Sequence, residues 1–206
     1  MAEIQYSIVE RTQISDDQLN ELVDLCTESF GKDNRDLIVL QTLAGGREET
    51  KKKAFYKLVW STGKLFVAVR DGSTELLGAA VWYKPRETPD ETLSAQDASW
   101  PDLVAWKKEA AEILKDVNKS GQNIAPWYLN LIAVHPKYQG LGIGRALIED
   151  GRRQSNGAEL LLHASNEHNV QIYTRLGFTL QKSTFVRGPY GNFTMYLLAM
   201  PPPPSP

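Results

Sequence analysis

A glycine-rich turn after an apolar run is the segment of this sequence whose residue types most directly suggest chemistry. Residues 129–134 (LNLIAV) are mostly apolar and include β-branched side chains, which is typical of a strand. A turn at His135 and Pro136 follows, and residues 139–144 (QGLGIG) then open a helix. Glycine lets backbone N–H groups approach an anion closely, and the first turn of a helix offers unpaired donors. The segment therefore predicts a site for a phosphate or pyrophosphate.

Two common phosphate-binding motifs do not fit this turn. A dinucleotide-binding fold requires G-x-G-x-x-G and an acidic residue roughly 20 positions later. Here the glycines are spaced G-x-G-x-G, Arg145 stands in the place of the last glycine, and Glu159 is the one loosely placed acid. A P-loop requires G-x-x-x-x-G-K-[ST], and no Lys-Ser or Lys-Thr pair directly follows the turn. Both interpretations are therefore excluded.

Two coupled motifs instead resemble those of a known family. The pattern Q-x-x-G-x-G over residues 139–144, directly after the apolar strand, resembles the acetyl-CoA motif of the GNAT acetyltransferase superfamily. Asn166, Tyr173 seven residues later and the Leu-Gly-Phe of residues 176–178 are similar to the downstream motif of that family. The resemblance is strong over about residues 127–180. It points to the superfamily and not to any particular acceptor.

The resemblance implies acetyl-CoA (coenzyme A) as the cofactor. In this family the strand before the glycine turn leaves backbone groups free to pair with the pantetheine arm, and Ile132 and Val134 are the matching positions. Amides of the turn would hold the pyrophosphate without a metal ion. The implied cofactor-binding residues are Ile132, Val134, Gln139, Gly140, Leu141, Gly142, Ile143, Gly144, Arg145, Asn166 and Tyr173.

The same resemblance suggests which residues carry out acetyl transfer. Transfer to an amine needs a proton removed from the nitrogen and one delivered to the leaving thiolate. Tyr173 occupies the family position near the thioester sulfur, so we expect it to be the general acid, with a core tyrosine on an amphipathic helix as the alternative. Asn166 would hydrogen-bond the cofactor arm or cap the helix that it starts, and these two roles are compatible.

The general base is less well defined by the sequence. Many family members carry a glutamate at the position of Asn130, and an amide cannot accept the proton. A water-mediated route, His163 at the end of the next strand, or an acid from the first helices must take this role. His163 could equally be a satisfied polar residue at a strand end. We expect His135 to be structural or exposed.

The elements that must position these residues alternate between strands and helices. We predict strands over residues 4–11, 64–70, 75–83, 127–134, 158–164, 178–187 and 192–200. We predict helices from a cap at 15–17 to Phe30, over about 33–44 and 47–60, after a capping box at Ser99, and over 142–155 and 167–176. With the resemblance, this predicts an α/β (α+β) fold with a central, mixed, mostly antiparallel twisted sheet of about six or seven strands. Helices flank the sheet, and its two central strands splay apart.

We expect a single domain over residues 1–200, in which residues 85–126 form a helical insertion near the acceptor site. The proline-rich residues 201–206 are expected to be a disordered tail. Cys26 is the sole cysteine, which excludes an intrachain disulfide. His163 and His168 lie five positions apart without a second pair, so we predict no metal site.

Composition and charge exclude several classes of partner. The chain has 206 residues, 42% of them apolar, and a net charge of -2, so it offers no electrostatic footprint for nucleic acid. The N-terminus has neither the basic start nor the apolar stretch of a secretory signal, and no segment approaches the ~20 apolar residues of a membrane span. We therefore expect a cytoplasmic protein, as a monomer or a homodimer.

Aromatic residues mark the regions that build the acceptor site in GNAT proteins, although each could also be a core residue. Together they suggest a moderately apolar pocket for a small-molecule amine or an amino acid, with a protein N-terminus or lysine as the second choice. A module that binds acetyl-CoA without transferring the acetyl group is a further alternative, which Asn130 favours. These aromatic residues are Phe30, Trp82, Tyr83, Trp100, Trp106, Trp127 and Tyr190.

Overall fold

The computed structural model describes residues 4–30, 34–84, 99–115 and 126–202. Its strands are β1 (Tyr6–Arg11), β2 (Lys64–Arg70), β3 (Leu76–Tyr83), β4 (Trp127–Val134), β5 (Leu160–Ala164), β6 (Thr179–Val186) and β7 (Phe193–Met200). Its α-helices are α1 (Asp16–Phe30), α2 (Asn34–Leu43), α3 (Glu49–Ser61), α4 (Pro101–Lys115), α5 (Ile143–Gln154) and α6 (Glu167–Arg175). Most of the predicted tail and much of the predicted insertion lie outside the described residues.

The strands form one sheet in the order β1-β2-β3-β4-β5-β7-β6. Neighbouring strands are antiparallel except for the central pair β4 and β5, which is parallel. The predicted mixed, mostly antiparallel sheet is therefore confirmed, as is the helix between the two parallel strands, which such a crossover requires. No helix in the described ranges has the length and apolar character needed to cross a membrane.

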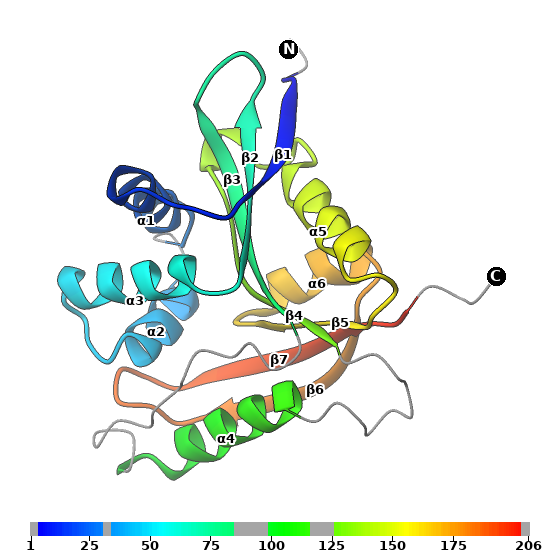
Figure 1. Ribbon diagram of the computed structural model, residues 1–206. Coiled ribbons are helices and arrows are strands. Elements are labelled where there is room, and N and C mark those ends of the chain that lie inside the picture. The colour runs from blue at the N-terminus through cyan, green and yellow to red at the C-terminus, as the bar shows by residue number, and fades with distance from the viewer. Residues whose placement is uncertain (1–3, 31–33, 85–98, 116–125, 203–206) are drawn as a thin grey trace.

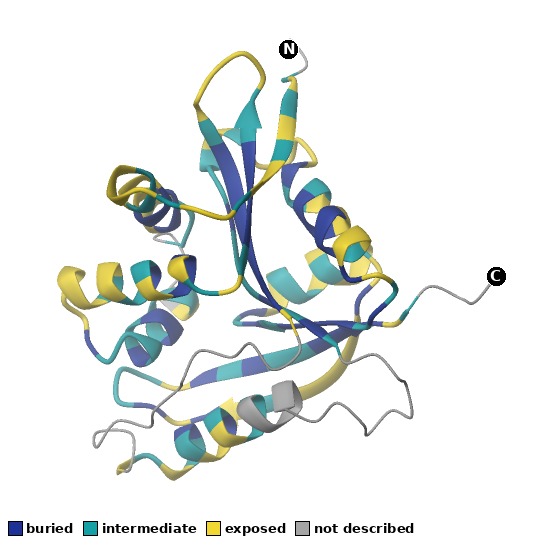
Figure 2. Ribbon diagram, in the orientation of Figure 1, coloured by how far each residue is buried: buried dark blue, intermediate teal, exposed yellow. Residues whose placement is uncertain are grey.

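Helices cover both faces of the sheet (Figure 1). Helices α5 and α6 pack on one face, where Leu147 and Phe178 join a core with the inward side chains of β2, β3 and β5. Helices α1 and α3 pack on the opposite face, and α2 with α4 covers β6 and β7 on that same side. Figure 2 shows the resulting gradient, with buried residues concentrated along the central strands and exposed residues on the outer sides of the helices.

A β-bulge interrupts β4 at Asn130. Val81 of β3 pairs with Leu131, and the next residue, Trp82, pairs with Leu129, so Asn130 is the extra residue on its strand. A bulge bends its strand and redirects the side chains that follow. In the described residues, the pairing of β4 with β5 covers only residues 127–129 and 160–162, whereas β4 continues to Val134. The two central strands therefore diverge beyond the bulge, as the sequence predicted.

Candidate active site

The glycine turn has the backbone geometry of an anion site. A single 3-10 turn, η2 (Pro136–Tyr138), follows β4, and the chain then reaches α5 through Gly140 and Gly142. Both glycines have left-handed φ values, 78° and 84°, which L side chains adopt only with strain. The Gln139 side-chain amide donates to the Val134 carbonyl at 3.1 Å and closes the turn against the strand.

The space above this turn is open. A Cβ atom placed on Gly140 or Gly142 would meet nothing within 4 Å, and one on Gly144 would meet only a methyl group of Val134, at 3.7 Å. The first bond into α5 runs from the Ala146 amide to the Gly142 carbonyl at 2.9 Å, so the amides of residues 143–145 precede the helical hydrogen-bond ladder. Their donors and the helix dipole fit a pyrophosphate group.

The downstream motif starts and fills helix α6. Asn166 is its N-cap, with a side-chain oxygen that accepts from the Asn169 amide at 2.8 Å. The helix cap, one of the two roles expected of Asn166, is therefore present. Two turns further on, the Tyr173 ring meets the Phe178 ring edge-on at 5.9 Å between centroids. Burial raises the pKa of the Tyr173 phenol, and the negative charge of Asp36 raises it further, so the hydroxyl keeps its proton at neutral pH.

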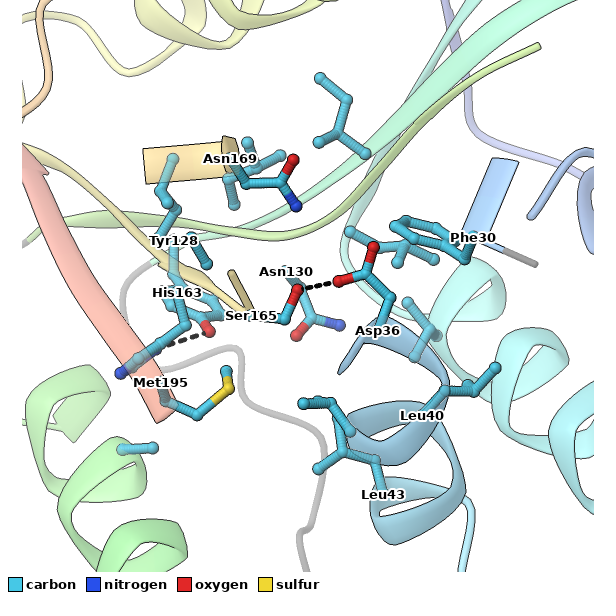
Figure 3. Close-up of a pocket in the computed structure, with 18 of the residues that line it drawn as sticks. Phe30, Asp36, Leu40, Leu43, Tyr128, Asn130, His163, Ser165, Asn169 and Met195 are labelled. Carbon is cyan, nitrogen blue, oxygen red and sulfur yellow. Dashed lines mark hydrogen bonds between the residues drawn. The ribbon is translucent and has the colours of Figure 1, made fainter. Parts of the chain in front are cut away.

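A cavity of about 340 Å³ lies where β4 and β5 diverge. Its wall includes Asn130 and Ile132 from β4, His163 from β5 and Tyr173 from α6, together with residues of α2, α3 and α4. Because α6 lies on one face of the sheet and α2–α4 lie on the other, the lining draws on both faces. The three residues predicted for catalysis, Tyr173, Asn130 and His163, therefore share one cavity. Figure 3 shows Asn130 and His163 on its wall.

Asn130 holds a buried hydroxyl in place. Its side-chain amide donates to the Tyr83 hydroxyl at 3.2 Å, and that hydroxyl lies 2.6 Å from the Thr62 hydroxyl. Asn130 thus occupies the position where the family commonly carries an acid, but its side chain acts as a donor toward Tyr83. Nothing in this arrangement gives Asn130 the ability to accept a proton.

His163 is a half-buried, neutral group on the wall. Its Nδ1 atom lies 3.0 Å from the Tyr128 hydroxyl, and the Trp106 ring meets its ring at 87°. Burial lowers the pKa of His163 to about 4, against an opposing effect of Glu109. The imidazole is therefore uncharged at neutral pH. In the described residues, no group of three or more histidine, cysteine, aspartate or glutamate side chains is placed to hold a metal ion.

Asp36 is a wall residue that sequence reasoning foresaw only as an unspecified acid from the first helices. Its carboxylate accepts hydrogen bonds from the Ser165 hydroxyl and from the Asn166 side-chain amide, the latter at 2.9 Å. Figure 3 shows the carboxylate turned toward Ser165, with Leu40 and Leu43 of the same helix below it. These partners lie about 130 positions away in the sequence. No local pattern could therefore have marked Asp36.

The prediction that aromatic residues line the acceptor pocket is only partly correct. Phe30, Tyr83 and Trp106 line the cavity. Trp82 and Trp127 belong instead to the core beneath α5, where a glycine of that helix packs directly on the Trp82 ring. The remaining two lie elsewhere, Trp100 against the core between α2 and α4 and Tyr190 beneath the Arg47 guanidinium. On β3, the alternation of side chains places Tyr83 on the cavity and Trp82 on the opposite face.

His135 is structural, as expected. Its Nδ1 accepts from the Lys137 amide at 3.2 Å and so shapes the start of the turn. Its Nε2 lies 3.1 Å from a carboxylate oxygen of Glu28 on α1, and its ring packs against Tyr138. The histidine therefore links the glycine turn to the first helix and takes no part in the cavity.

Comparison with known proteins points to the same family that the two sequence motifs resemble. A family model described as an acetyltransferase (GNAT) domain matches residues 104–180. No curated protein matches the chain.

Solved structures match along nearly the full length. One from Corynebacterium glutamicum, described as histone acetyltransferase HPA2 and related acetyltransferase, is 19% identical, covers 97% of this chain and 98% of its own, and has a TM-score of 0.62. PH1933 from Pyrococcus horikoshii is 16% identical, with coverages of 97% and 99% and a TM-score of 0.62. The ribosomal-protein-S18-alanine N-acetyltransferase of Escherichia coli is 15% identical, with coverages of 98% and 97% and a TM-score of 0.55.

The match of residues 104–180 to that family model, and the shared fold of these structures, agree with the resemblance that the two motifs indicated. The matched segment is therefore of the acetyltransferase type.

Proposed function

We propose that the protein is an acetyl-CoA-dependent N-acetyltransferase that moves an acetyl group by direct transfer to the primary amine of a small molecule or amino acid. The observation that carries this proposal is the divergence of β4 and β5 beside the glycine turn, with Tyr173 in the wall of the cavity between them. In this arrangement a donor bound along β4 and an acceptor bound in the cavity would meet at the Tyr173 hydroxyl. A direct transfer requires such a meeting point.

The donor would be held mainly by backbone groups. The β4 segment at Ile132 and Val134 lies beyond its pairing with β5 and would bind the pantetheine arm. The turn of residues 139–145 would bind the pyrophosphate, because the space beside Gly140 and Gly142 is open and the dipole of α5 favours an anion at its start. When bound, acetyl-CoA supplies the thioester carbonyl that the amine attacks.

The residues of the cavity would then move two protons. The neutral amine nitrogen bonds to the acetyl carbon, the carbon–sulfur bond breaks, and the sulfur takes the hydroxyl proton of Tyr173. The nitrogen loses one proton, which we assign first to Asp36, because its negative charge is the one that acts on the Tyr173 phenol. That proton leaves to solvent and one proton returns from solvent to Tyr173, so the neutral amine and the thioester yield an amide and a thiol. An acceptor that arrives as an ammonium first releases one proton to solvent.

A free-thiol release screen with acetyl-CoA and a panel of amines, amino acids and peptides tests the proposal. We expect thiol release with at least one small amine, and a drop in kcat of about 100-fold in Tyr173→Phe with acetyl-CoA affinity nearly unchanged. Tyr196→Phe is the matched control, because the Tyr196 hydroxyl donates to Glu167 at 3.4 Å and the residue does not line the cavity. Unchanged turnover in Tyr173→Phe would remove the general-acid assignment.

A binding module without transferase activity is the second candidate. Asn130 favours it, because an amide stands where the family commonly carries an acid and donates to Tyr83 at 3.2 Å. A thermal shift with coenzyme A, but no thiol release over the whole panel, would support the module. Release with peptides alone would support a protein or peptide N-acetyltransferase.

A further inference from the structure

The bulge in β4 sets the direction of the Asn130 side chain. Leu131 packs against the core beneath α1 and α3, and Asn130, directly before it, reaches Tyr83 of that same core. Two successive residues of β4 therefore face one side of the sheet, which the ordinary alternation of a strand does not allow. β-Bulges often redirect a side chain beside a functional site. Asn130 lines the cavity, and Figure 3 shows its amide in the middle of the lining side chains.

Hydrogen bonds within the protein fix which end of this amide faces the wall. The Thr62 hydroxyl lies 3.1 Å from two carbonyl oxygens of the last turn of α3, so it donates to one of them. It therefore accepts from the Tyr83 hydroxyl, 2.6 Å away, whose proton is thereby used. The Tyr83 oxygen in turn accepts from the Asn130 amide nitrogen at 3.2 Å. This chain of bonds holds the nitrogen end of the amide against the wall.

The oxygen end of the Asn130 amide is open to the cavity. Among the described residues it has no hydrogen-bond partner, and the buried side-chain polar atoms that lack one belong instead to Tyr56 and three tryptophans. The oxygen of this half-buried residue is therefore accessible, and the surface it lies on is the cavity wall. It provides a hydrogen-bond acceptor whose orientation is fixed before a ligand arrives.

A primary amine has the matching donor. Its neutral nitrogen carries two N–H groups, and acetyl transfer removes one of these protons, which Asp36 takes in the proposed reaction. The second N–H persists from the bound amine to the amide product. A secondary amine has only one N–H, and after that proton has left, an alkyl group stands where the hydrogen bond to the protein would be.

We propose that the Asn130 carbonyl oxygen accepts a hydrogen bond from the N–H that the amine retains, and thereby selects primary over secondary amines. This inference rests on the proposed acetyl transfer and adds a residue that determines its specificity. A site that binds an N–H rejects the analogue without it, because the acceptor on the protein is then left without a partner. Asn130 thus holds the reacting nitrogen and takes no proton from it.

Three amines and their N-methyl derivatives test this selection: hexylamine, phenethylamine and β-alanine. We expect kcat/KM for each primary amine that reacts to exceed that for its derivative by about 100-fold. Asn130→Leu should lower this ratio to about tenfold or less, because only the bulk of the methyl group then discriminates. Asn130→Asp should retain the ratio, since a carboxylate also accepts from an N–H.

Asn169→Leu is the matched control for Asn130→Leu. Asn169 lines the same cavity, but within the described ranges its side-chain amide has no hydrogen bond that fixes which end faces the ligand. We expect the ratio of primary to secondary amine to be unchanged in this variant. Melting temperatures check that each variant folds.

Tyr83→Phe tests the orientation of the amide. The substitution removes the oxygen that holds the Asn130 nitrogen, so the amide can turn and we expect the ratio to fall about fivefold. In the Asn130→Asp background the same substitution should leave the ratio unchanged, since both carboxylate oxygens are acceptors. An equal fall in both backgrounds would reduce Tyr83 to a structural role and overturn the inference.

The outcomes separate this inference from the proposed function. Thiol release with the same ratio in wild type and Asn130→Leu overturns the inference and leaves acetyl transfer standing. An equally large loss of the ratio in Asn169→Leu overturns it as well. If no amine releases thiol, the proposed function fails, and calorimetric titration of N-phenethylacetamide and its N-methyl derivative into the coenzyme A complex decides the inference. About tenfold tighter binding of the N–H form that Asn130→Leu abolishes supports it, and equal affinity or no binding overturns it.

Discussion

The glycine turn (residues 139–145) and the helical wall (the cavity-lining residues of α2, α3 and α4) represent two ways of building a binding site. The turn offers backbone donors whose positions follow from two left-handed glycines and a helix start. The wall consists of side chains from three separate helices, with one carboxylate and one lysine among the described lining residues. A backbone site fits a chemical group that many proteins share, whereas a wall of side chains can differ from one protein to the next.

The largest expected effect tests the turn. Gly142→Glu places a side chain at a φ of 84° and a carboxylate in the open space where the phosphates would bind. We expect acetyl-CoA affinity, measured by calorimetry, to fall on the order of 1000-fold through charge repulsion and the distorted cradle.

Gly72→Glu is the control for backbone strain. Gly72 has a φ of 71° in the turn between β2 and β3, and a Cβ there also meets nothing within 4 Å. The two variants thus carry similar strain, and only one of them has its side chain in the cradle. Equal acetyl-CoA affinity in both variants would show that the turn is not the phosphate site.

The same contrast explains what the sequence could and could not predict. The turn, the N-cap at Asn166 and the strands over 64–70 and 127–134 follow from local spacing, and the structure has them where they were predicted. The partners of Asp36 could not be foreseen, because they depend on tertiary contacts across about 130 positions. The bulge at Asn130 was also missed. A single extra residue leaves the apolar pattern of a strand nearly intact while it changes which side chains face the cavity.

The second prediction concerns His163, the half-buried histidine of the cavity wall. The folded pKa of His163, about 4, lies below the ordinary value of 6.5. Between these two values the unfolded chain binds a proton that the folded protein does not, so the free energy of unfolding falls as the pH drops through this range. We expect His163 to account for at most roughly 3 kcal/mol of that loss.

Urea unfolding of wild type and His163→Gln across this pH range measures the effect. Other titrating groups contribute alike to both proteins, so the difference between the two curves isolates His163. The variant should lose less stability in acid. Parallel curves would mean that His163 is as easily protonated in the folded protein as in the unfolded chain.

The third prediction fills the helical wall and leaves the turn untouched. Leu43→Trp adds bulk to a half-buried position of α2 that lines the cavity. We expect kcat/KM for the acceptor to fall about tenfold, with the affinity for acetyl-CoA unchanged. Leu180→Trp is the control, because Leu180 is 49% exposed on β6 and does not line the cavity. A matching loss of acetyl-CoA affinity in Leu43→Trp would show that the two sites are not separable.

The smallest effect concerns Asn166, which links helix α6 to the helical wall. Its side-chain oxygen caps α6 through Asn169, and its amide nitrogen donates to Asp36 on the helical wall at 2.9 Å. We expect Asn166→Ala to lower the free energy of unfolding by about 1 to 2 kcal/mol, because both bonds are lost. Asn166→Ser should recover about half of this loss, since serine can cap the helix but cannot reach Asp36.

The same pair of variants separates the helix cap from contact with the cofactor arm. Asn166 is only 4% exposed, and both ends of its amide are engaged within the protein, so we expect the acetyl-CoA affinity to change by no more than about threefold in either variant. A loss above about tenfold in both variants, with a normal melting temperature, would instead assign the amide to the cofactor arm. The acetyl-CoA site would then include the Asn166 side chain as well as the backbone donors of the glycine turn.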